Sequence, residues 1–247
     1  MSIRNHGQLE KLRAIGKIVR RVLDQTAAAV RPGITTGELN EIGARILEAH
    51  GAESAPPKVY GFPGALCISV NEEAIHGIPG SRVIQTGDLV KLDLVASKDG
   101  YFADAAITVA VGEVSATALA LVRCAESAFH LAAQVARQGN RVYDIGRVVE
   151  QETRRCGFQV MRELCGHGVG QTIHEEPSVP NFHDPRARTR LTEGLVITIE
   201  PIIAAGGGKG DLQRDHWTIC TADKSLSAHY EHTLVITRGE PILLTAA

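Results

Sequence analysis

One unit of this chain occurs twice at a nearly constant offset, and this duplication restricts the possible folds more than any other feature. RPGITTGELNEIGARILEAHG, from Arg31 to Gly51, aligns with RQGNRVYDIGRVVEQETRRCG, from Arg137 to Gly157, at an offset of 106 residues. In both copies a glycine turn precedes an amphipathic helix, and a second glycine follows that helix. A long unit that occurs only twice indicates a pseudo-twofold domain rather than a solenoid.

Strand-like segments repeat as well. TGDLVKLD, which ends at Asp93, matches EGLVITIE, which ends at Glu200, at an offset of 107 residues, so each copy places a carboxylate at the end of an apolar strand. A single antiparallel sheet with the helices on one side would bring the strand pairs of the two halves together at its centre. We therefore expect one domain of the α/β (α+β) class over residues 1–247, with pseudo-symmetric halves at about 1–112 and 113–247.

Periodicity and turn residues predict the other elements. Thr35 and Glu38 have the spacing of a capping box, which marks the start of a helix. The predicted helices cover Gln8 to Val30, Thr35 to Glu48, Thr117 to Arg137 and Asp144 to Arg155. The segment from Pro56 to Gly64 is expected to be an irregular connection, and a short strand is expected from Leu66 to Val70.

The segment LVKLDLVASKDGYFADAAITV, from Leu89 to Val109, predicts a β-hairpin because two apolar runs flank the turn residues Lys98-Asp99-Gly100. A turn centred between Lys98 and Asp99 would place Asp93 directly opposite Asp104. Two like charges at cross-strand distance are unfavourable when exposed, and far more so when buried. We therefore expect a cation between the two carboxylates.

The candidate site combines the carboxylates of both halves with three histidines. Its members are Asp93, Asp104, Glu200, Glu231, His76, His167 and His174. Each of them, taken singly, has an ordinary structural interpretation, but the repeated pairing of carboxylates favours a shared site. Buried carboxylates at such a density cannot all stay ionised without cations. Oxygen ligands with one imidazole nitrogen suit Mn, Fe, Co or Zn, and we expect two ions bridged by shared oxygens. The remaining histidines with no matched spacing are expected to be structural, namely His183, His216, His229 and His232.

Composition excludes several classes of function. The net charge of −2 gives no electrostatic basis for binding nucleic acid or an anionic membrane, and no apolar run approaches the ~20 residues of a membrane span. The N-terminal MSIRNHGQLE is too polar for a signal peptide. Five scattered cysteines indicate reduced thiols, so a cytoplasmic protein is expected. The motifs HExxH, GxSxG and Walker A do not occur in the sequence.

Several motifs together resemble those of type I methionine aminopeptidase. They are NEEAIHGIP, LDLVASKDGYFAD, GHGVGQTIHEEP, ITIEP and WTICTADKSLSAHYEHT, and the resemblance extends from about Ile3 to Arg238. It implies the pita-bread fold of the metallopeptidases, whose internal pseudo-symmetry agrees with the repeat. Only 25 residues separate His174 from Glu200. The insertion of the type II enzymes is therefore absent, and the chain looks like the short bacterial form.

The resemblance also implies a ligand set for the metals. The positions of the family's ligands are occupied by Asp93, Asp104, His167, Glu200 and Glu231. In this arrangement Asp93 and Asp104 chelate, Asp104 and Glu231 bridge, and His167 and Glu200 hold one of two divalent ions (Co, Mn, Fe or Zn).

The reaction that the resemblance implies is removal of the N-terminal methionine from peptides whose second residue is small. Glu200 would accept a proton, and His174 would stabilise the oxygen of the tetrahedral intermediate. His76 would contact the scissile amide or the leaving nitrogen. The implied partners are the N-termini of nascent polypeptides, at the ribosome or away from it, and the protein is expected to be a monomer.

The expected methionine pocket includes Phe62, Cys67 and Trp217, because aromatic and soft apolar groups suit a thioether. The chain departs from the family's pattern at Val59 and Ile173, where aromatic residues are usual, and at Ala105-Ala106, where Thr-Ser is usual. The first difference makes the pocket less aromatic. The second removes hydroxyls that could orient groups around the metals.

Two alternatives stay open. The first is a proline-directed peptidase of the same fold, such as prolidase or aminopeptidase P, although 247 residues leave no room for the large N-terminal domain of those enzymes. The second is a non-catalytic binding module with the same fold, although such modules usually lose metal ligands and this chain has the full set.

Overall fold

The computed structural model describes residues 1–246. The helices are α1 (His6–Ala29), α2 (Thr36–Ala49), α3 (Pro56–Tyr60), α4 (Ala116–Val135) and α5 (Val142–Arg155). The strands are β1 (Glu53–Ser54), β2 (Cys67–Val70), β3 (Glu73–Ile75), β4 (Leu89–Lys98), β5 (Tyr101–Ala110), β6 (Gln159–Val160), β7 (Cys165–Gly168), β8 (Glu175–Pro180), β9 (Val196–Ile199), β10 (Ile202–Ala204), β11 (Gly210–Leu212), β12 (Ile219–Thr221), β13 (Ser227–His229), β14 (Glu231–Val235) and β15 (Ile242–Leu243).

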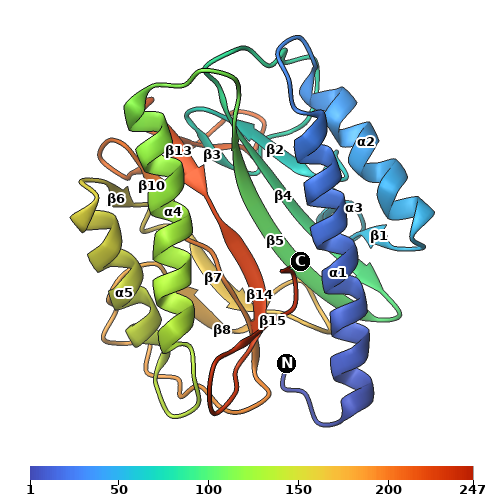
Figure 1. The fold of residues 1–247 in the computed structure, drawn as a ribbon, viewed down its shortest axis with the longest axis vertical. Coiled ribbons are helices and arrows are strands. Elements are labelled where there is room, and N and C mark those ends of the chain that lie inside the picture. Colours follow the sequence, from blue (N-terminus) through green and yellow to red (C-terminus); the bar gives the residue numbers. More distant parts are fainter. Residues whose placement is uncertain (247) are drawn as a thin grey trace.

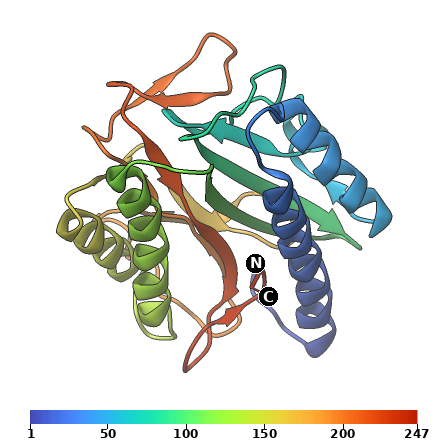
Figure 2. The same cartoon turned by 45° about the horizontal axis from the view of Figure 1, so that its top comes forward.

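The main sheet has nine strands, with β1-β4-β5-β14-β9-β7-β8 along its path, β2 beside β4 and β15 beside β14. Its strand pairs are antiparallel. Helices α1 and α2 cover one half of a face of this sheet, and α4 and α5 cover the other half of the same face (Figures 1 and 2). The predicted fold class, an antiparallel sheet covered by helices on one side, is confirmed.

Side chains along the central strands point alternately to the two faces of the sheet, so the core lies on one face and the site on the other. Val90, Leu92 and Leu94 of β4 pack into one core cluster with residues of α1 and α2. Because successive side chains of a strand point to opposite faces, Lys91 and Asp93 lie on the face away from the helices. The helix pairs therefore bury one face of the sheet and leave the opposite face to the candidate site.

The two copies of the repeated unit have matching local structure. Helices α2 and α5 are both 14 residues long, and both of their bounds differ by 106 residues. Gly33 and Gly139 precede them with φ of 92° and 96°, and Gly51 and Gly157 follow them with φ of 60° and 84°. Only glycine adopts such angles at little cost, so the repeated glycines mark repeated turns. The division into halves near residue 112 stays a prediction.

The hairpin register differs from the predicted one. Lys98 pairs with Tyr101 around a two-residue turn of Asp99 and Gly100, which have φ of 51° and 78°. Such a turn matches the twist of the strands. It moves the pairing by two residues, so that Asp93 faces Ala106 and Asp104 faces Val95.

The prediction that Asp93 lies directly opposite Asp104 is therefore wrong, although the two carboxylates share a face as expected. Asp93 also lies in the middle of β4 rather than at the end of a strand. Glu200, in contrast, directly follows β9 as predicted.

The segment predicted to be irregular contains a short helix. In α3, Pro56 and Pro57 occupy the first helical positions and Gly61 ends the helix in a left-handed conformation. Proline at the start and glycine at the end are typical of helix boundaries. The sequence therefore contained the signal for this short helix. No helix among the described residues combines the length and apolar character that crossing a membrane requires.

Candidate metal centre

Adjacent strands bring the predicted carboxylates together on the uncovered face. Ala106 of β5 pairs with Asp93 on one side and with Glu231 of β14 on the other. The three side chains therefore form a row across three strands, with a small one in the middle. Asp104 lies two residues before Ala106 on the same face, and Glu200 follows β9, the next strand along the sheet.

Every predicted ligand is nearly inaccessible to solvent. The exposed fractions are 9% for Asp93, 4% for Asp104, 8% for His167, 5% for Glu200 and 2% for Glu231. Acidic side chains are almost never buried this deeply unless they are paired or coordinate a metal.

His167 occupies the position and orientation of a metal ligand. Its Nδ1 lies 2.9 Å from the carbonyl oxygen of Gly168. Its Nε2 faces Oδ2 of Asp104 at 3.6 Å and Oε1 of Glu200 at 3.7 Å. A backbone acceptor at Nδ1 fixes the proton there and leaves the Nε2 lone pair for a cation, as in most histidine–metal sites.

Buried threonines position the acids. The hydroxyl of Thr198 donates to Oε1 of Glu200 at 3.0 Å and accepts from the backbone N–H of His167 at 3.0 Å. Thr233 does the same for the backbone of Asp104, donating to its carbonyl at 2.7 Å and accepting from its N–H at 2.9 Å. These contacts hold the backbone on which the carboxylates converge.

Burial and neighbouring charges shift the pKa values of the site residues. Burial, with Asp104 and Glu200 nearby, raises the pKa of both Asp93 and Glu231 well above the usual range. Burial raises the pKa of Glu200 to about 8. Burial alone would lower the pKa of His167, but contacts with Asp104 and Glu200 raise it to about 9. The environment thus disfavours the anionic forms of Asp93, Glu200 and Glu231 and favours the cationic form of His167.

Unpaired polar atoms concentrate at the same place. Six buried side-chain nitrogen or oxygen atoms lack a hydrogen-bond partner among residues 1–246, and four of them belong to Asp104 (Oδ1), Glu231 (Oε1) and His229 (both ring nitrogens). Ligand atoms of Asp104, His167 and Glu231 lie within 4.8 Å of one another. Buried polar groups are normally paired, so unpaired carboxylate oxygens beside a well-oriented imidazole fit a divalent cation with oxygen and nitrogen ligands.

A cavity of about 560 Å³ opens onto the acidic cluster. Its lining includes the predicted site residues His76, His174, Phe62, Cys67 and Trp217, together with all five predicted ligands. The rings of Phe62 and Trp217 meet edge to face, with centroids 5.2 Å apart. The cavity therefore combines aromatic and apolar lining residues with the acidic cluster.

Two positions that depart from the family's pattern differ in their relation to the cavity. Ile173 lines it, whereas Val59 is 50% exposed and is not part of the lining. The interpretation that Val59 makes the pocket less aromatic is therefore wrong, because the turn of α3 directs the neighbouring Tyr60 to the cavity instead.

The two further predicted histidines, His76 and His174, line the same cavity as the acidic cluster. The ring of His174 is 4.2 Å from that of His167 between centroids, and its Nδ1 lies 2.6 Å from the hydroxyl of Tyr60. Burial, and then the charge of His167, lower the pKa of His174. Burial also lowers the pKa of His76. His76 follows β3 with a φ of 58°, an uncommon conformation for a residue with a side chain.

Three polar residues were not among the predicted site residues, namely Tyr60 and His229, which contact site residues, and Lys91, which lies on the same face of β4 as Asp93. Tyr60 contacts His174, and His229 lies with its Nε2 3.4 Å from Oε2 of Glu231. Lys91 is fully buried, and its ammonium group donates to the carbonyl oxygen of Asn71 at 2.7 Å. Burial lowers the pKa of Lys91 to about 7. Its position two residues before Asp93, and that of His229 two residues before Glu231, could have indicated a shared face.

The glycines around His167 permit close packing, which yields a testable prediction. A Cβ atom on Gly168 would lie 2.3 Å from the carbonyl oxygen of Glu176, whereas one on Gly80 would meet nothing within 4 Å. Gly168→Ala is expected to reduce the free energy of unfolding by ~2 kcal/mol or more, because the clash is with backbone. Urea denaturation measures this effect. Gly80→Ala is the matched control, and equal stability of the two variants would contradict the prediction.

Comparisons with known proteins agree with this geometry. The sequence pattern of metallopeptidase family M24 matches residues 10–238. Methionine aminopeptidase 2 of Bacillus subtilis is 42% identical over 247 residues, which is 99% of both chains. The crystal structure of methionine aminopeptidase from Rickettsia prowazekii superposes with a TM-score of 0.96 at 33% identity and covers 100% of both chains. The resemblance drawn from the sequence motifs is confirmed.

A prolidase from Pyrococcus furiosus shares the fold alone. It superposes with a TM-score of 0.80 at 21% identity, and the match covers 99% of this chain but 65% of the prolidase. The longer chain of the prolidase therefore extends well beyond the shared part.

Proposed function

This chain belongs to metallopeptidase family M24, and from this premise we propose that it removes the N-terminal methionine from nascent proteins and peptides with a small second residue. The observation that supports the proposal most strongly is the junction of a buried acidic cluster, with unpaired carboxylate oxygens, and a cavity edged by Phe62 and Trp217. Chains of this family are metal-dependent hydrolases, and the ligand set suits divalent ions.

The proposed ligands are those that face one another on the sheet. Asp93 and Asp104 would chelate one ion, Asp104 and Glu231 would bridge, and His167 with Glu200 would hold a second ion. Co, Mn, Fe and Zn all suit these donors. Divalent ions in such a site act as Lewis acids that polarise a carbonyl and lower the pKa of water. The unpaired Oδ1 of Asp104 and Oε1 of Glu231 support this assignment.

The residues around the cluster have separate roles in the proposed hydrolysis. Glu200 would accept a proton and pass it to the leaving amine, and its position between Thr198 and His167 suits this exchange. His174 would donate to the oxygen that develops negative charge. His76, which lines the same cavity, would contact the scissile amide or the leaving nitrogen.

The cavity also accounts for the proposed selectivity. Phe62, Cys67 and Trp217 provide a lining that a thioether side chain would fill, since sulfur packs well against aromatic rings. The free ammonium group of the substrate would lie beside the buried carboxylates, which attract a cation. A peptide bond further along a chain has no free amine there, so only the terminal residue would be removed.

A direct assay tests the proposed function. The full-length protein, stripped with a chelator and then titrated with Mn, Fe or Co, is expected to release methionine from Met-Ala-Ser and to leave Ala-Pro substrates intact. Cleavage of the proline substrate alone would support a proline-directed peptidase instead. Failure to bind any divalent ion in calorimetry would support a non-catalytic binding module.

Tyr60 gives a prediction of its own. Its hydroxyl, 2.6 Å from Nδ1 of His174, would donate to that nitrogen and so keep the ring proton on Nε2, where the oxyanion would accept it. Tyr60→Phe is expected to lower kcat about tenfold, the equivalent of one hydrogen bond, with KM unchanged. Steady-state kinetics on Met-Ala-Ser measures this. Tyr143→Phe, at another tyrosine beside a histidine, is the control, and wild-type kcat in Tyr60→Phe would contradict the role.

The cellular setting remains a set of predictions. Action on nascent chains at the ribosome, a monomeric state and a cytoplasmic location all follow from the resemblance and the composition. Ribosome co-sedimentation and analytical ultracentrifugation would test the first two.

A further inference from the structure

His229 is a deeply buried polar side chain next to the metal centre without an assigned role. It is 1% exposed, and neither of its ring nitrogens has a hydrogen-bond partner among residues 1–246. Its Nε2 lies 3.4 Å from Oε2 of Glu231 and 4.0 Å from Oε2 of Glu200. A buried imidazole without partners is costly, so its orientation towards two carboxylates requires an explanation.

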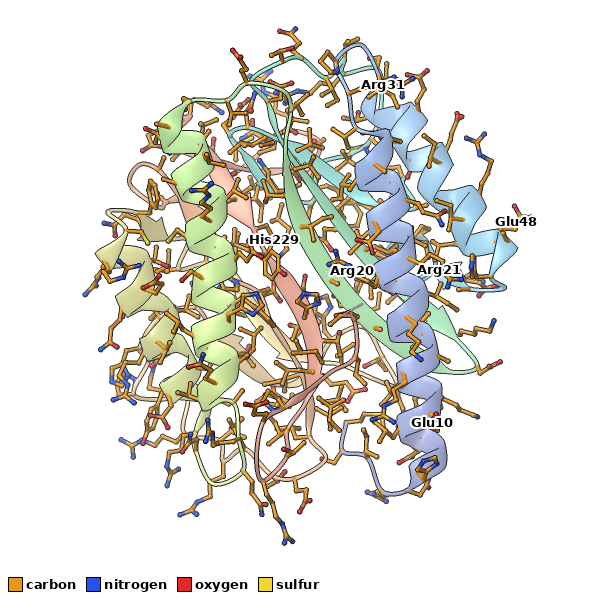
Figure 3. All side chains as sticks on the ribbon, viewed as in Figure 1. Glu10, Arg20, Arg21, Arg31, Glu48 and His229 are labelled. Carbon is orange, nitrogen blue, oxygen red and sulfur yellow. The ribbon has the colours of Figure 1, made fainter. Side chains whose placement is uncertain are left out.

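The backbone holds His229 rigidly in this place. Its N–H donates to the hydroxyl of Thr108 at 2.9 Å, and the same hydroxyl donates to the His229 carbonyl at 2.8 Å. His229, the last residue of β13, also pairs with Ile202, the first residue of β10. Figure 3 shows the residue between α4 and α1, at the end of β13. The ring is therefore presented to the acids by a fixed backbone rather than by a mobile loop.

A comparison with His167 indicates which nitrogen of His229 carries the proton. In His167, a carbonyl oxygen 2.9 Å from Nδ1 holds the proton there and frees Nε2. His229 has no acceptor for a proton at Nδ1 within the described residues, while its Nε2 faces two carboxylate oxygens. When bound cations keep both carboxylates ionised, a neutral ring with N–H on Nε2 attracts these oxygens, whereas a lone pair there would repel them.

We propose that His229 is a positioning residue of the metal centre, whose Nε2–H faces Oε2 of Glu231 at 3.4 Å and attracts Oε2 of Glu200, 4.0 Å away, electrostatically. The contact leaves Oε1 of Glu231, which is unpaired and buried, available to bind an ion. The role depends on metal binding by these acids and not on the identity of the peptide substrate, so it can fail or hold independently of the proposed aminopeptidase activity.

The competing role is that of a further ligand. Oxygen and nitrogen atoms that share an ion are also separated by a few ångströms, and ligand atoms of Glu200, His229 and Glu231 lie within 4.8 Å of one another. A ligating Nε2 would need its proton on Nδ1, where metal-bound histidines almost always have an acceptor. That acceptor is missing among residues 1–246, which favours donation over ligation.

The proton position can be measured directly on the wild-type chain. In the full-length protein loaded with Zn(II), long-range ¹H–¹⁵N correlation spectra distinguish the two tautomers of each histidine. The proposal predicts that His229 carries its proton on Nε2 and that His167 carries its proton on Nδ1. A proton on Nδ1 of His229 would overturn the proposal in favour of ligation.

Two substitutions test the consequence for metal binding. Glutamine at position 229 can place an amide N–H near the site of Nε2, whereas the shorter asparagine reaches only the site of Nδ1. Calorimetric titration of the chelator-stripped variants with Mn(II) is expected to give an affinity within about threefold of the wild type for His229→Gln. For His229→Asn a loss of about 10–100-fold is expected, the range found when partners of metal ligands are removed.

Any other pattern contradicts the positioning role. Wild-type affinity in both variants would show that the contact is dispensable, and equal losses in both would indicate a ligand or a purely structural residue. Circular dichroism of the metal-free variants checks that both are folded. If either variant does not fold, the tautomer measurement on the wild type decides by itself.

Discussion

Glu231→Gln is expected to have two opposite effects, a loss of metal binding and a gain in the stability of the metal-free protein. Removing the charged carboxylate of a proposed bridging ligand should lower turnover by about a thousandfold, or ~4 kcal/mol. In the metal-free protein, the same change removes one of four buried acids that repel one another, and an uncharged amide of similar size takes its place. Steady-state kinetics and thermal melts in a chelator measure the two effects.

The gain in stability should depend on pH with a definite sign. Burial, with Asp104 and Glu200 nearby, raises the pKa of Glu231 well above its ordinary 4.5. At a pH between 4.5 and the raised pKa, Glu231 keeps its proton in the folded chain and has released it in the unfolded chain. The metal-free wild type therefore loses stability as the pH rises through this range. The slope for one such group is about 1.4 kcal/mol per pH unit. Glu231→Gln lacks this contribution, so its advantage should be small at pH 4.5 and should grow towards neutral pH.

The control for this prediction is Glu163→Gln, which changes an exposed acid on the rim of the same cavity. It should alter neither metal affinity nor the pH dependence of stability. A Glu231→Gln protein that is less stable than the wild type in chelator at pH 7.5 would show that the buried carboxylates do not repel one another as inferred.

His174→Ala is expected to lower kcat by 10²–10³, the usual cost of removing one donor to a developing oxyanion. The affinity for Mn(II) should stay at the wild-type value, because the His174 ring lies beside His167 but is not among the proposed ligands. Kinetics and calorimetry on the same preparation separate the two effects. His6→Ala, at an exposed histidine, serves as the control.

A weakened metal affinity in His174→Ala would contradict this division of roles, and so would activity within twofold of the wild type. The comparison with Glu231→Gln is informative because the two residues line one cavity. One variant should lose the ions, and the other should keep them and lose only the reaction.

The helices that carry the repeat were predictable because their signals are local. Thr35 and Glu38 form the predicted capping box, with the Glu38 N–H 3.1 Å from the Thr35 hydroxyl and the Thr35 N–H 2.8 Å from the Glu38 carboxylate. The C-terminal glycines have positive φ in both copies. Such interactions involve residues a few positions apart, so the sequence contains both partners side by side.

The hairpin register was only partly predictable. The two-residue alternation of side chains along the strands predicted that Asp93 and Asp104 share a face. The exact pairing depended on the type of turn, and the turn residues were compatible with more than one type. A shift of the turn by one position moved the pairing to Asp93 and Ala106. The placement of Ala106 between two acids depends on this register and on the pairing of β5 with β14, which are far apart in the sequence.

The sequence by itself determined which residues are the acids, which segments repeat, and that charges of one sign must share a face. Only the tertiary structure decided which other polar side chains lie next to the acids. Tyr60 reaches the site through α3, and no periodicity links it to the acids. His229 lies two residues before Glu231, but the approach of its ring to Glu200 depends on how separate strands are assembled. Local patterns specify the direction of a side chain within its own element, whereas the distance between two elements depends on how the whole sheet is assembled.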